Sequence, residues 1–197
     1  GRKMKLENGS HSAAVARATS YFSPTSAYND CTGGIRYYQF LDDVIREFEK
    51  DPKPLIAKLE EVSKKLFTKE NMLISYTCDK AGFPALSESM KHLTDALPEG
   101  KGTVYPFQFQ PELKNEGFKT SSQVNYVARC GNFRLGEELD YTGALRILKL
   151  ILSYDYLWQN LRVKGGAYGC MSGFGRSGEG YFVSYRDPKM KETNEVY

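Results

Sequence analysis

The spacing of apolar and polar residues predicts four helices in the first half of the chain, over residues 10–21, 35–48, 52–66 and 86–97. In each segment apolar residues recur every three or four positions, so that one face can pack while the opposite face is solvated. The segment 52–66 shows this most clearly, because leucine and valine alternate there with a lysine- and glutamate-rich face.

Polar and proline residues predict where these helices begin and end. Ser10 is expected to cap the first helix, and Pro24 is expected to end it. Asp51 and Pro52 have the order of an N-cap followed by a proline in the first helical position, so they should begin the third helix.

Strand-like alternation predicts the remaining elements. Residues 71–78 alternate more and less polar side chains and are expected to form a strand. Residues 98–119 hold three prolines and three glycines without a sustained period, which indicates a linker. After this linker the pattern predicts three strands, over residues 124–129, 167–175 and 180–186. It also predicts a long helix over residues 144–161 and a last helix that begins at Asp187-Pro188. This order of elements is typical of an α+β fold.

Composition and charge narrow the classes of partner. Lysine and arginine number 27 against 24 aspartate and glutamate, a net charge of +3, which argues against nucleic acid or an anionic membrane as a partner. The sequence contains no run of eighteen apolar residues, so it predicts no membrane-spanning helix. The four cysteines are widely separated, which favours a reduced, cytoplasmic compartment.

The number and spacing of the histidines bear on whether the sequence holds a metal site. Only His11 and His92 are present, and neither lies in an HExxH or HxxEH pattern that would place two ligands one helical turn apart. We therefore predict no metal site in this sequence and interpret His92 as an ordinary, partly buried histidine. No GxSxG pattern indicates a serine nucleophile, and the cysteines are interpreted as packed side chains.

A glycine-rich segment, residues 173–178, formally matches the GxGxxG pattern of dinucleotide sites. Such a site needs a helix after the glycines, whereas Tyr181–Tyr185 reads as a strand. The favoured interpretation is a glycine-rich hairpin, with nucleotide binding as a less favoured alternative.

The most informative stretch joins the long helix to the next strand. Arg162 and Tyr168 lie near the two ends of a segment whose Gly165 and Gly166 would let the backbone approach a ligand. Arginine offers a planar fork for a carbonyl or carboxylate group, and tyrosine offers a hydroxyl donor. From the residues alone this is a candidate anion or carbonyl site, and a helix C-cap with a surface arginine remains the alternative.

The segments Trp158–Gly169 and Ser184–Pro188 resemble the presequence-protease (falcilysin-like) branch of the insulinase/pitrilysin zinc peptidases. The regions around Gly9–His11, Gly33–Leu41 and Gln123–Val127 are similar to that branch as well. The resemblance implies a helix-plus-antiparallel-sheet sandwich of the insulinase/pitrilysin type.

The same resemblance implies a function. In that family an N-terminal half holds zinc through HxxEH, and a C-terminal half adds an arginine and a tyrosine to a closed chamber around a peptide. Arg162 and Tyr168 match these two positions, six residues apart, and would be catalytic. Gly165, Gly166 and Ala167 between them are expected to bind substrate. Zinc would be the cofactor of the full-length enzyme, with its ligands outside this sequence.

The sequence also departs from the family, because it has no HxxEH. We therefore expect part of the C-terminal half, truncated at both ends: residues 1–97 from a third family domain, 98–119 as linker and 120–197 from a fourth. Its expected partners are peptide substrates, the N-terminal half and, through exposed sheet edges, a second copy. A non-catalytic scaffold of the same fold is the alternative function, and a mitochondrial or plastid matrix is the alternative compartment.

Overall fold

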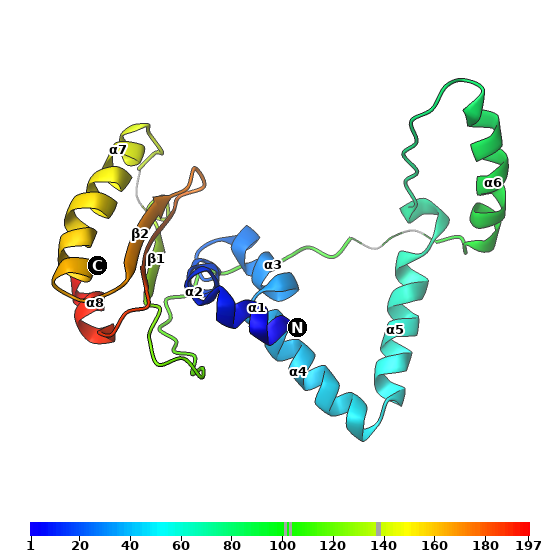
Figure 1. The fold of residues 1–197 in the computed structure, drawn as a ribbon. Helices are drawn as coiled ribbons and strands as arrows, with labels where there is room; N and C mark the ends of the chain where they lie inside the picture. Colours follow the sequence, from blue (N-terminus) through cyan, green and yellow to red (C-terminus); the bar gives the residue numbers. More distant parts are fainter. Residues whose placement is uncertain (101, 103, 137–138) are drawn as a thin grey trace. The chain divides into compact units, whose positions relative to one another are not determined.

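The structure, a computed structural model, describes residues 1–100, 102, 104–136 and 139–197. Its elements are α1 (Arg2–Asn8), α2 (Ser10–Thr19), α3 (Pro24–Gly33), α4 (Ile35–Lys50), α5 (Lys53–Leu66), the 3₁₀ turn η1 (Lys69–Asn71), α6 (Gly82–Ala96), β1 (Ala128–Asn132), α7 (Ala144–Ile151), the π-helical η2 (Leu152–Tyr156) and η3 (Trp158–Val163), β2 (Gly169–Phe174), β3 (Glu179–Tyr185) and α8 (Met190–Val196) (Figure 1). Helices combined with a small antiparallel sheet confirm an α+β chain.

Two compact units divide the chain. One unit comprises residues 1–41 together with 108–197, and the other comprises residues 42–107. The division into family domains at residues 98–119 stays a prediction. Among the described residues, no helix combines the length and the apolar character that crossing a membrane requires.

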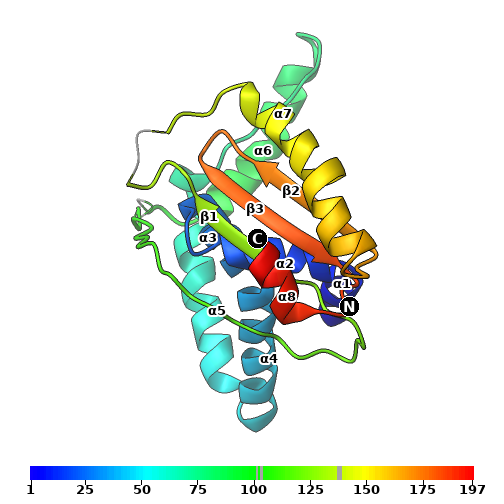
Figure 2. The ribbon, with the colours of Figure 1, turned by 90° about the vertical axis from the view of Figure 1, so that its left-hand side faces the viewer.

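In the first unit, a three-stranded antiparallel sheet lies between two sets of helices (Figure 1). Its order is β1-β3-β2, with Cys130 opposite Tyr181 and Met171 opposite Val183. The continuous helical run from α7 through η3 packs on β2, and α2 packs on β1 and β3 (Figure 2). The long helix and the hairpin expected from the sequence are therefore confirmed.

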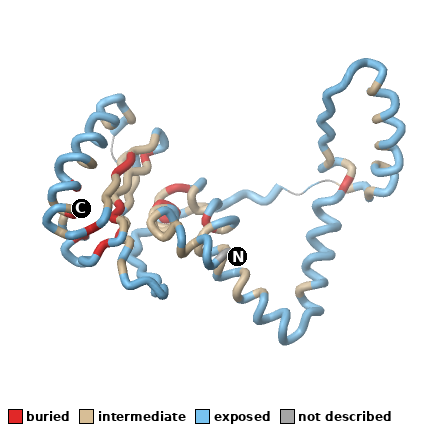
Figure 3. The backbone as a smooth tube through the Cα atoms, viewed as in Figure 1, coloured by how far each residue is buried: buried red, intermediate tan, exposed pale blue. Residues whose placement is uncertain are grey.

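The core of this unit forms where the long helix meets the sheet. Leu157, Leu161 and Ala167 are buried and pack together. Around them lie partly buried apolar side chains, namely Leu152, Cys170, Phe182, Val196 and Tyr197. Figure 3 shows the buried positions gathered on the strands and the adjoining helices. This core fixes the segment that connects η3 to β2.

The second unit, residues 42–107, keeps most of its apolar side chains exposed. Leu59, Val62 and Leu66 on α5 are each about half exposed or more, as Figure 3 indicates for the whole helix. The strand expected over residues 71–78 is wrong: residue 71 ends η1, and residues 72–78 form no strand and pair with no described strand. Alternation predicts a strand only if a neighbour satisfies its backbone groups, and Leu73 is 92% exposed here.

Several expected helix boundaries differ from the observed ones. Ser10 does not cap α2, because its hydroxyl donates back to the Glu7 carbonyl at 2.7 Å. Pro24 begins α3 instead of only ending α2, and the Ser23 hydroxyl accepts a hydrogen bond from the Ser26 amide. The first strand begins at Ala128 rather than at residue 124, although Asn125 makes an isolated bridge with Asp187.

Within the first unit, a charge network ties residues 108–119 to α2 and α3. Arg17 donates to both carboxylate oxygens of Glu116, at 2.8 and 3.0 Å, and to Asp30 at 2.6 Å. The Tyr21 hydroxyl also donates to Glu116, and the Glu112 amide donates to the Tyr21 carbonyl at 3.0 Å. The Arg17 guanidinium, with smaller help from Tyr21 and Lys114, lowers the pKa of Glu116 from 4.5 to about 2.

Glu116→Gln should destabilise the first unit by about 2 kcal/mol at neutral pH, because charged hydrogen bonds to a largely buried arginine are lost. A lowered folded-state pKa stabilises the protein above pH 4.5, and this stabilisation is lost as the pH falls toward 2. The free energy of unfolding, measured with urea, should therefore fall more steeply across this pH range for the wild type than for the variant.

Asp140→Asn is the matched control, because Asp140 is 86% exposed in its ion pair with Arg134. It should change the free energy of unfolding by less than about 0.5 kcal/mol. Equal losses in the two variants would contradict the role assigned to the Arg17–Glu116 contact.

Candidate functional site

The site is built on a sharp reversal between η3 and β2. The Ala167 amide donates to the Leu161 carbonyl at 2.9 Å, and the Gly166 amide donates to the Arg162 carbonyl at 3.1 Å. Gly166 has φ +85°, a left-handed conformation that glycine adopts without steric cost. The reversal therefore satisfies the last helical carbonyls and turns the chain directly into the strand.

Gly165 is required for a different reason, which is lack of space. A Cβ atom at this position would lie 2.5 Å from the Leu161 carbonyl oxygen and 3.0 Å from that of Asn160. These are backbone atoms that cannot rotate away, so a larger residue would push the reversal open. Gly165 thus lets the backbone approach the helix closely, whereas a Cβ atom at Gly166 would meet only Pro188, at 3.6 Å. Approach of a ligand to these two glycines stays a prediction.

Ala167 and Tyr168 follow the reversal and point to opposite environments. Ala167 is buried in the core, whereas Tyr168 is 63% exposed. The Tyr168 amide donates to the Tyr185 carbonyl at 3.0 Å and more weakly to the Arg186 carbonyl at 3.3 Å. These hydrogen bonds anchor the backbone of Tyr168, while its ring stays accessible.

Arg162 and Tyr168 are in contact. The guanidinium carbon of Arg162 lies 5.1 Å from the centroid of the Tyr168 ring and 4.7 Å from that of the Trp158 ring. Both distances are within the range of cation–π attraction, which is worth about 0.5–1 kcal/mol at an exposed site. The two predicted site residues therefore meet, and the guanidinium is held between two aromatic side chains.

Arg186 is a second cation at this site, and the sequence did not predict it there. Arg186 places its guanidinium carbon 6.0 Å from the Tyr168 ring and 5.5 Å from the Tyr185 ring. Its φ of +49° is uncommon for a residue other than glycine. Arg186 belongs to the motif Ser184–Pro188, but an arginine at a strand end carries no sequence signal that reveals such a contact.

Aromatic rings extend the site along the start of the sheet. Tyr185 has its ring centroid 6.0 Å from Tyr168, 5.5 Å from Tyr126 and 5.1 Å from His11. The ring contacts to Tyr126 and His11 are edge-to-face, a favourable arrangement for aromatic quadrupoles. Residues far apart in the sequence thus support the position of Tyr168.

Cysteine chemistry is disfavoured near this site. Burial raises the pKa of the Cys170 thiol, and the nearby charge of Arg162 only partly opposes that effect. Burial also raises the pKa of Cys130, to about 12. Both thiols are protonated at neutral pH and are poor nucleophiles, as expected for packed cysteines.

The residues that the structure describes do not fit a zinc ion. They contain no group of three or more histidine, cysteine, aspartate or glutamate side chains that could hold a metal. His11 contacts Tyr185 and Ser12, and neither side chain is a carboxylate or thiolate ligand.

The comparisons with known proteins bear on the same residues. Residues 115–197, which carry the sheet, Arg162 and Tyr168, match the family model described as the PreP C-terminal domain. The chain is presequence-protease-like. This finding confirms the resemblance that the sequence motifs indicated.

Similar proteins cover nearly the whole chain. Protein HypA of Clostridium perfringens is 39% identical over 188 residues, which is 95% of this chain. Presequence protease 1, chloroplastic/mitochondrial, of Arabidopsis thaliana is 30% identical over 98% of the chain. The mitochondrial presequence protease of Yarrowia lipolytica is 28% identical over 95%. The chain spans about a fifth of the length of each of these relatives: 19%, 18% and 19%.

In this presequence-protease-like chain, Gly165→Ala should lower the melting temperature by several degrees. The added methyl group collides with the Leu161 carbonyl, and overpacking of this kind costs about 1–3 kcal/mol. Gly131→Ala is the control, because a Cβ atom at Gly131 in β1 meets no atom within 4 Å. Thermal unfolding followed by circular dichroism measures both, and equal melting temperatures would contradict the close approach.

Proposed function

We propose that this chain is part of the C-terminal half of a zinc-dependent endopeptidase that degrades peptides inside a closed chamber. In this proposal residues 1–97 belong to a third family domain, 98–119 form a linker and 120–197 begin a fourth. Similarity to presequence proteases supports a peptidase. The contact between Arg162 and Tyr168 is the observation that carries the assignment of the site.

The proposed role of this half is to bind the substrate and its transition state. Arg162 offers several N–H donors in one plane and Tyr168 offers one hydroxyl donor, both beside the start of β2. Positioned donors of this kind stabilise negative charge that develops on a carbonyl oxygen during peptide cleavage. The backbone of Gly165, Gly166 and Ala167 would lie along the bound peptide.

The aromatic contacts explain why such donors would be effective. Trp158 and Tyr168 contact the Arg162 guanidinium, and the ring of Tyr168 is itself in contact with the ring of Tyr185. Less side-chain freedom remains to be lost when a substrate binds, which is the general advantage of a preorganised site. The zinc ligands and the attacking water belong to the N-terminal half in this proposal, so this chain alone should bind no stoichiometric zinc and cleave no peptide.

The compartment follows from the relatives only as a proposal. Two of the similar proteins are named as mitochondrial or chloroplastic/mitochondrial. We expect a mitochondrial or plastid matrix to be reducing, which would keep the four cysteines free, as they are here. The cytoplasm predicted from cysteine spacing stays an alternative prediction.

Arg162→Ala and Tyr168→Phe should each lower turnover of a peptide substrate about a hundredfold in the full-length enzyme, because each removes one donor to the developing charge. Arg162→Lys should rescue little, because an ammonium group does not reproduce the planar fork. Steady-state kinetics and the zinc content of each purified variant are the measurements, and zinc content should not change.

Lys164→Ala is the matched control. Lys164 lies in the same segment and is exposed, but its ammonium group faces Asn160 at 3.3 Å rather than Tyr168. Its loss should leave turnover within about twofold of the wild type. Wild-type turnover in both Arg162→Ala and Tyr168→Phe would favour the alternative, a scaffold in which this region takes no part in catalysis.

A further inference from the structure

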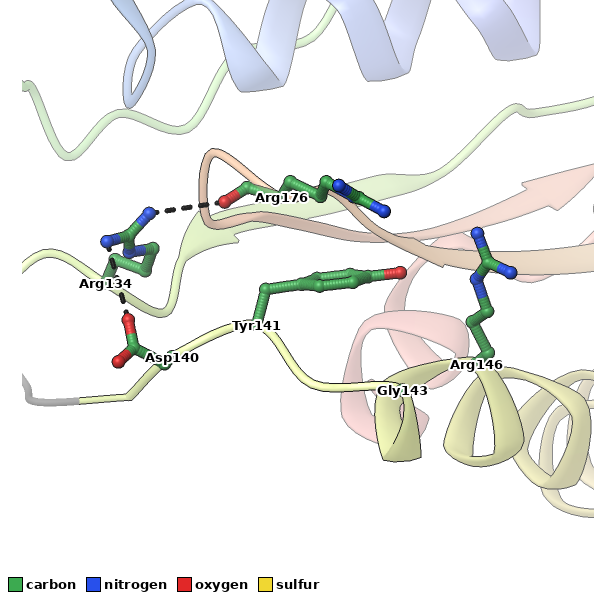
Figure 4. Close-up of a pocket in the computed structure, with 6 residues that line it drawn as sticks. All are labelled: Arg134, Asp140, Tyr141, Gly143, Arg146 and Arg176. Carbon is green, nitrogen blue, oxygen red and sulfur yellow. Dashed lines mark hydrogen bonds and ion pairs between the residues drawn. The ribbon is translucent and has the colours of Figure 1, made fainter.

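A second surface of the first unit gathers three arginine side chains around one hollow. A pocket of about 660 Å³ is lined by Arg134, Asp140, Tyr141, Gly143, Arg146 and Arg176 (Figure 4). Three arginines thus face one aspartate across an open hollow. Its lining comes from the β2–β3 turn, the end of β1 and the start of α7, which are distant from Arg162 and Tyr168.

The three arginines of the pocket differ in their contacts among the described residues. Arg134 pairs with Asp140 at 3.5 Å and also donates to the Arg176 carbonyl at 3.3 Å. Neither the Arg146 nor the Arg176 side chain makes an ion pair with a carboxylate among the described residues. Asp140 is 86% exposed, and the ion pair it makes is with Arg134.

The remaining donors converge. Figure 4 shows the Arg146 and Arg176 guanidinium groups and the Tyr141 hydroxyl pointing into the same space. Arg176 lies over the Tyr141 ring, with 5.8 Å between its guanidinium carbon and the ring centroid. The phenol ring provides an apolar wall beside two planar donor groups, a combination suited to an anion that carries an apolar stem.

We propose that this pocket binds the carboxylate side chain of an acidic peptide. Its volume is within the range of about 300–1,000 Å³ that organic ligands occupy, and is much larger than one inorganic anion needs. Guanidinium groups match a carboxylate bidentately, and the methylene groups of a glutamate would lie on Tyr141. The inference rests on the proposed function only for the source of the ligand, since a peptidase encounters peptides.

The pocket is separate from the Arg162–Tyr168 site. Tyr168 immediately precedes β2, and Arg176 follows it by two residues. Six strand residues at about 3.3 Å each place the two sites roughly 20 Å apart. The pocket would therefore select acidic residues away from the bond that is cleaved, and binding there needs no cleavage.

The test measures binding of short fluorescein-labelled peptides to the purified 197-residue chain by anisotropy. One peptide carries two glutamates, and its partner carries two glutamines at the same positions. The glutamate peptide should bind at least about tenfold more tightly, with an affinity that falls as the salt concentration rises. Equal binding of the two peptides would overturn the proposal.

Variants locate the binding. Arg146→Gln and Arg176→Gln should each weaken binding of the glutamate peptide about tenfold. Circular dichroism should confirm that both variants keep the fold. Arg36→Gln removes one equally exposed positive charge outside the pocket and should have less than about a twofold effect. If Arg36→Gln weakens binding as much as the pocket variants, general charge attraction accounts for the binding and the proposal is wrong.

Inorganic phosphate distinguishes an acidic peptide from a free anion. Phosphate should displace the glutamate peptide only at concentrations far above those of an unlabelled competing peptide, because it makes no contact with the Tyr141 wall. Displacement at equal concentrations would show a simple anion site and would contradict the peptide assignment. None of these outcomes depends on the turnover of the Arg162 and Tyr168 variants, so the two proposals can fail separately.

Discussion

The candidate site depends on how the backbone reverses between Leu161 and Tyr168. The amide of Ala167 is held by the last helical turn, and the amide of Tyr168 is held by β3. Because these neighbouring amides are bonded to two different elements, the helix end and the strand start are fixed relative to each other. The six-residue separation of Arg162 and Tyr168 then becomes a side-chain contact of 5.1 Å.

The core and the reversal support each other. Leu161 and Ala167 are both buried in the same cluster, so the residues that flank the glycines resist separation. The half-buried Arg162 and the exposed Tyr168 directly follow these two buried residues in the chain. A preorganised binding surface requires polar donors that are attached to a rigidly packed core, as these two are.

Positive charge is distributed unevenly over the first unit, although the net charge of the chain is only +3. Arg162 and Arg186 lie on aromatic rings at the start of β2. Arg146 and Arg176 line the pocket beyond its other end. Two groups of arginines on one sheet-and-helix layer would give an extended peptide two points of attachment, one at its backbone and one at an acidic side chain.

The elements that could be predicted from the sequence are those whose signal lies in the local spacing of residues. The helix over residues 144–161 and the hairpin after it were found where expected, because apolar spacing and turn glycines determine them directly. The glycine-rich segment 173–178 forms the expected hairpin, in which a Cβ atom at Gly173 would meet the Tyr181 ring at 2.4 Å.

Features that depend on distant partners were not predictable. The segment 71–78 has the alternation of a strand, but pairing is a tertiary property and no described strand pairs with it. Arg17 and Glu116 are 99 residues apart, so their ion pair leaves no trace in local spacing. The position of Arg186 beside Tyr168 likewise depends on the register of β3 against β2.

The central claim is that Arg162 and Tyr168 act as one unit, and a double-mutant cycle on turnover in the full-length enzyme tests it most directly. If the two side chains jointly hold one group, the variant with both Arg162→Ala and Tyr168→Phe should be little slower than the slower single variant. Losses that multiply, so that the double variant is slower by the product of the two single effects, would show independent side chains and contradict the account.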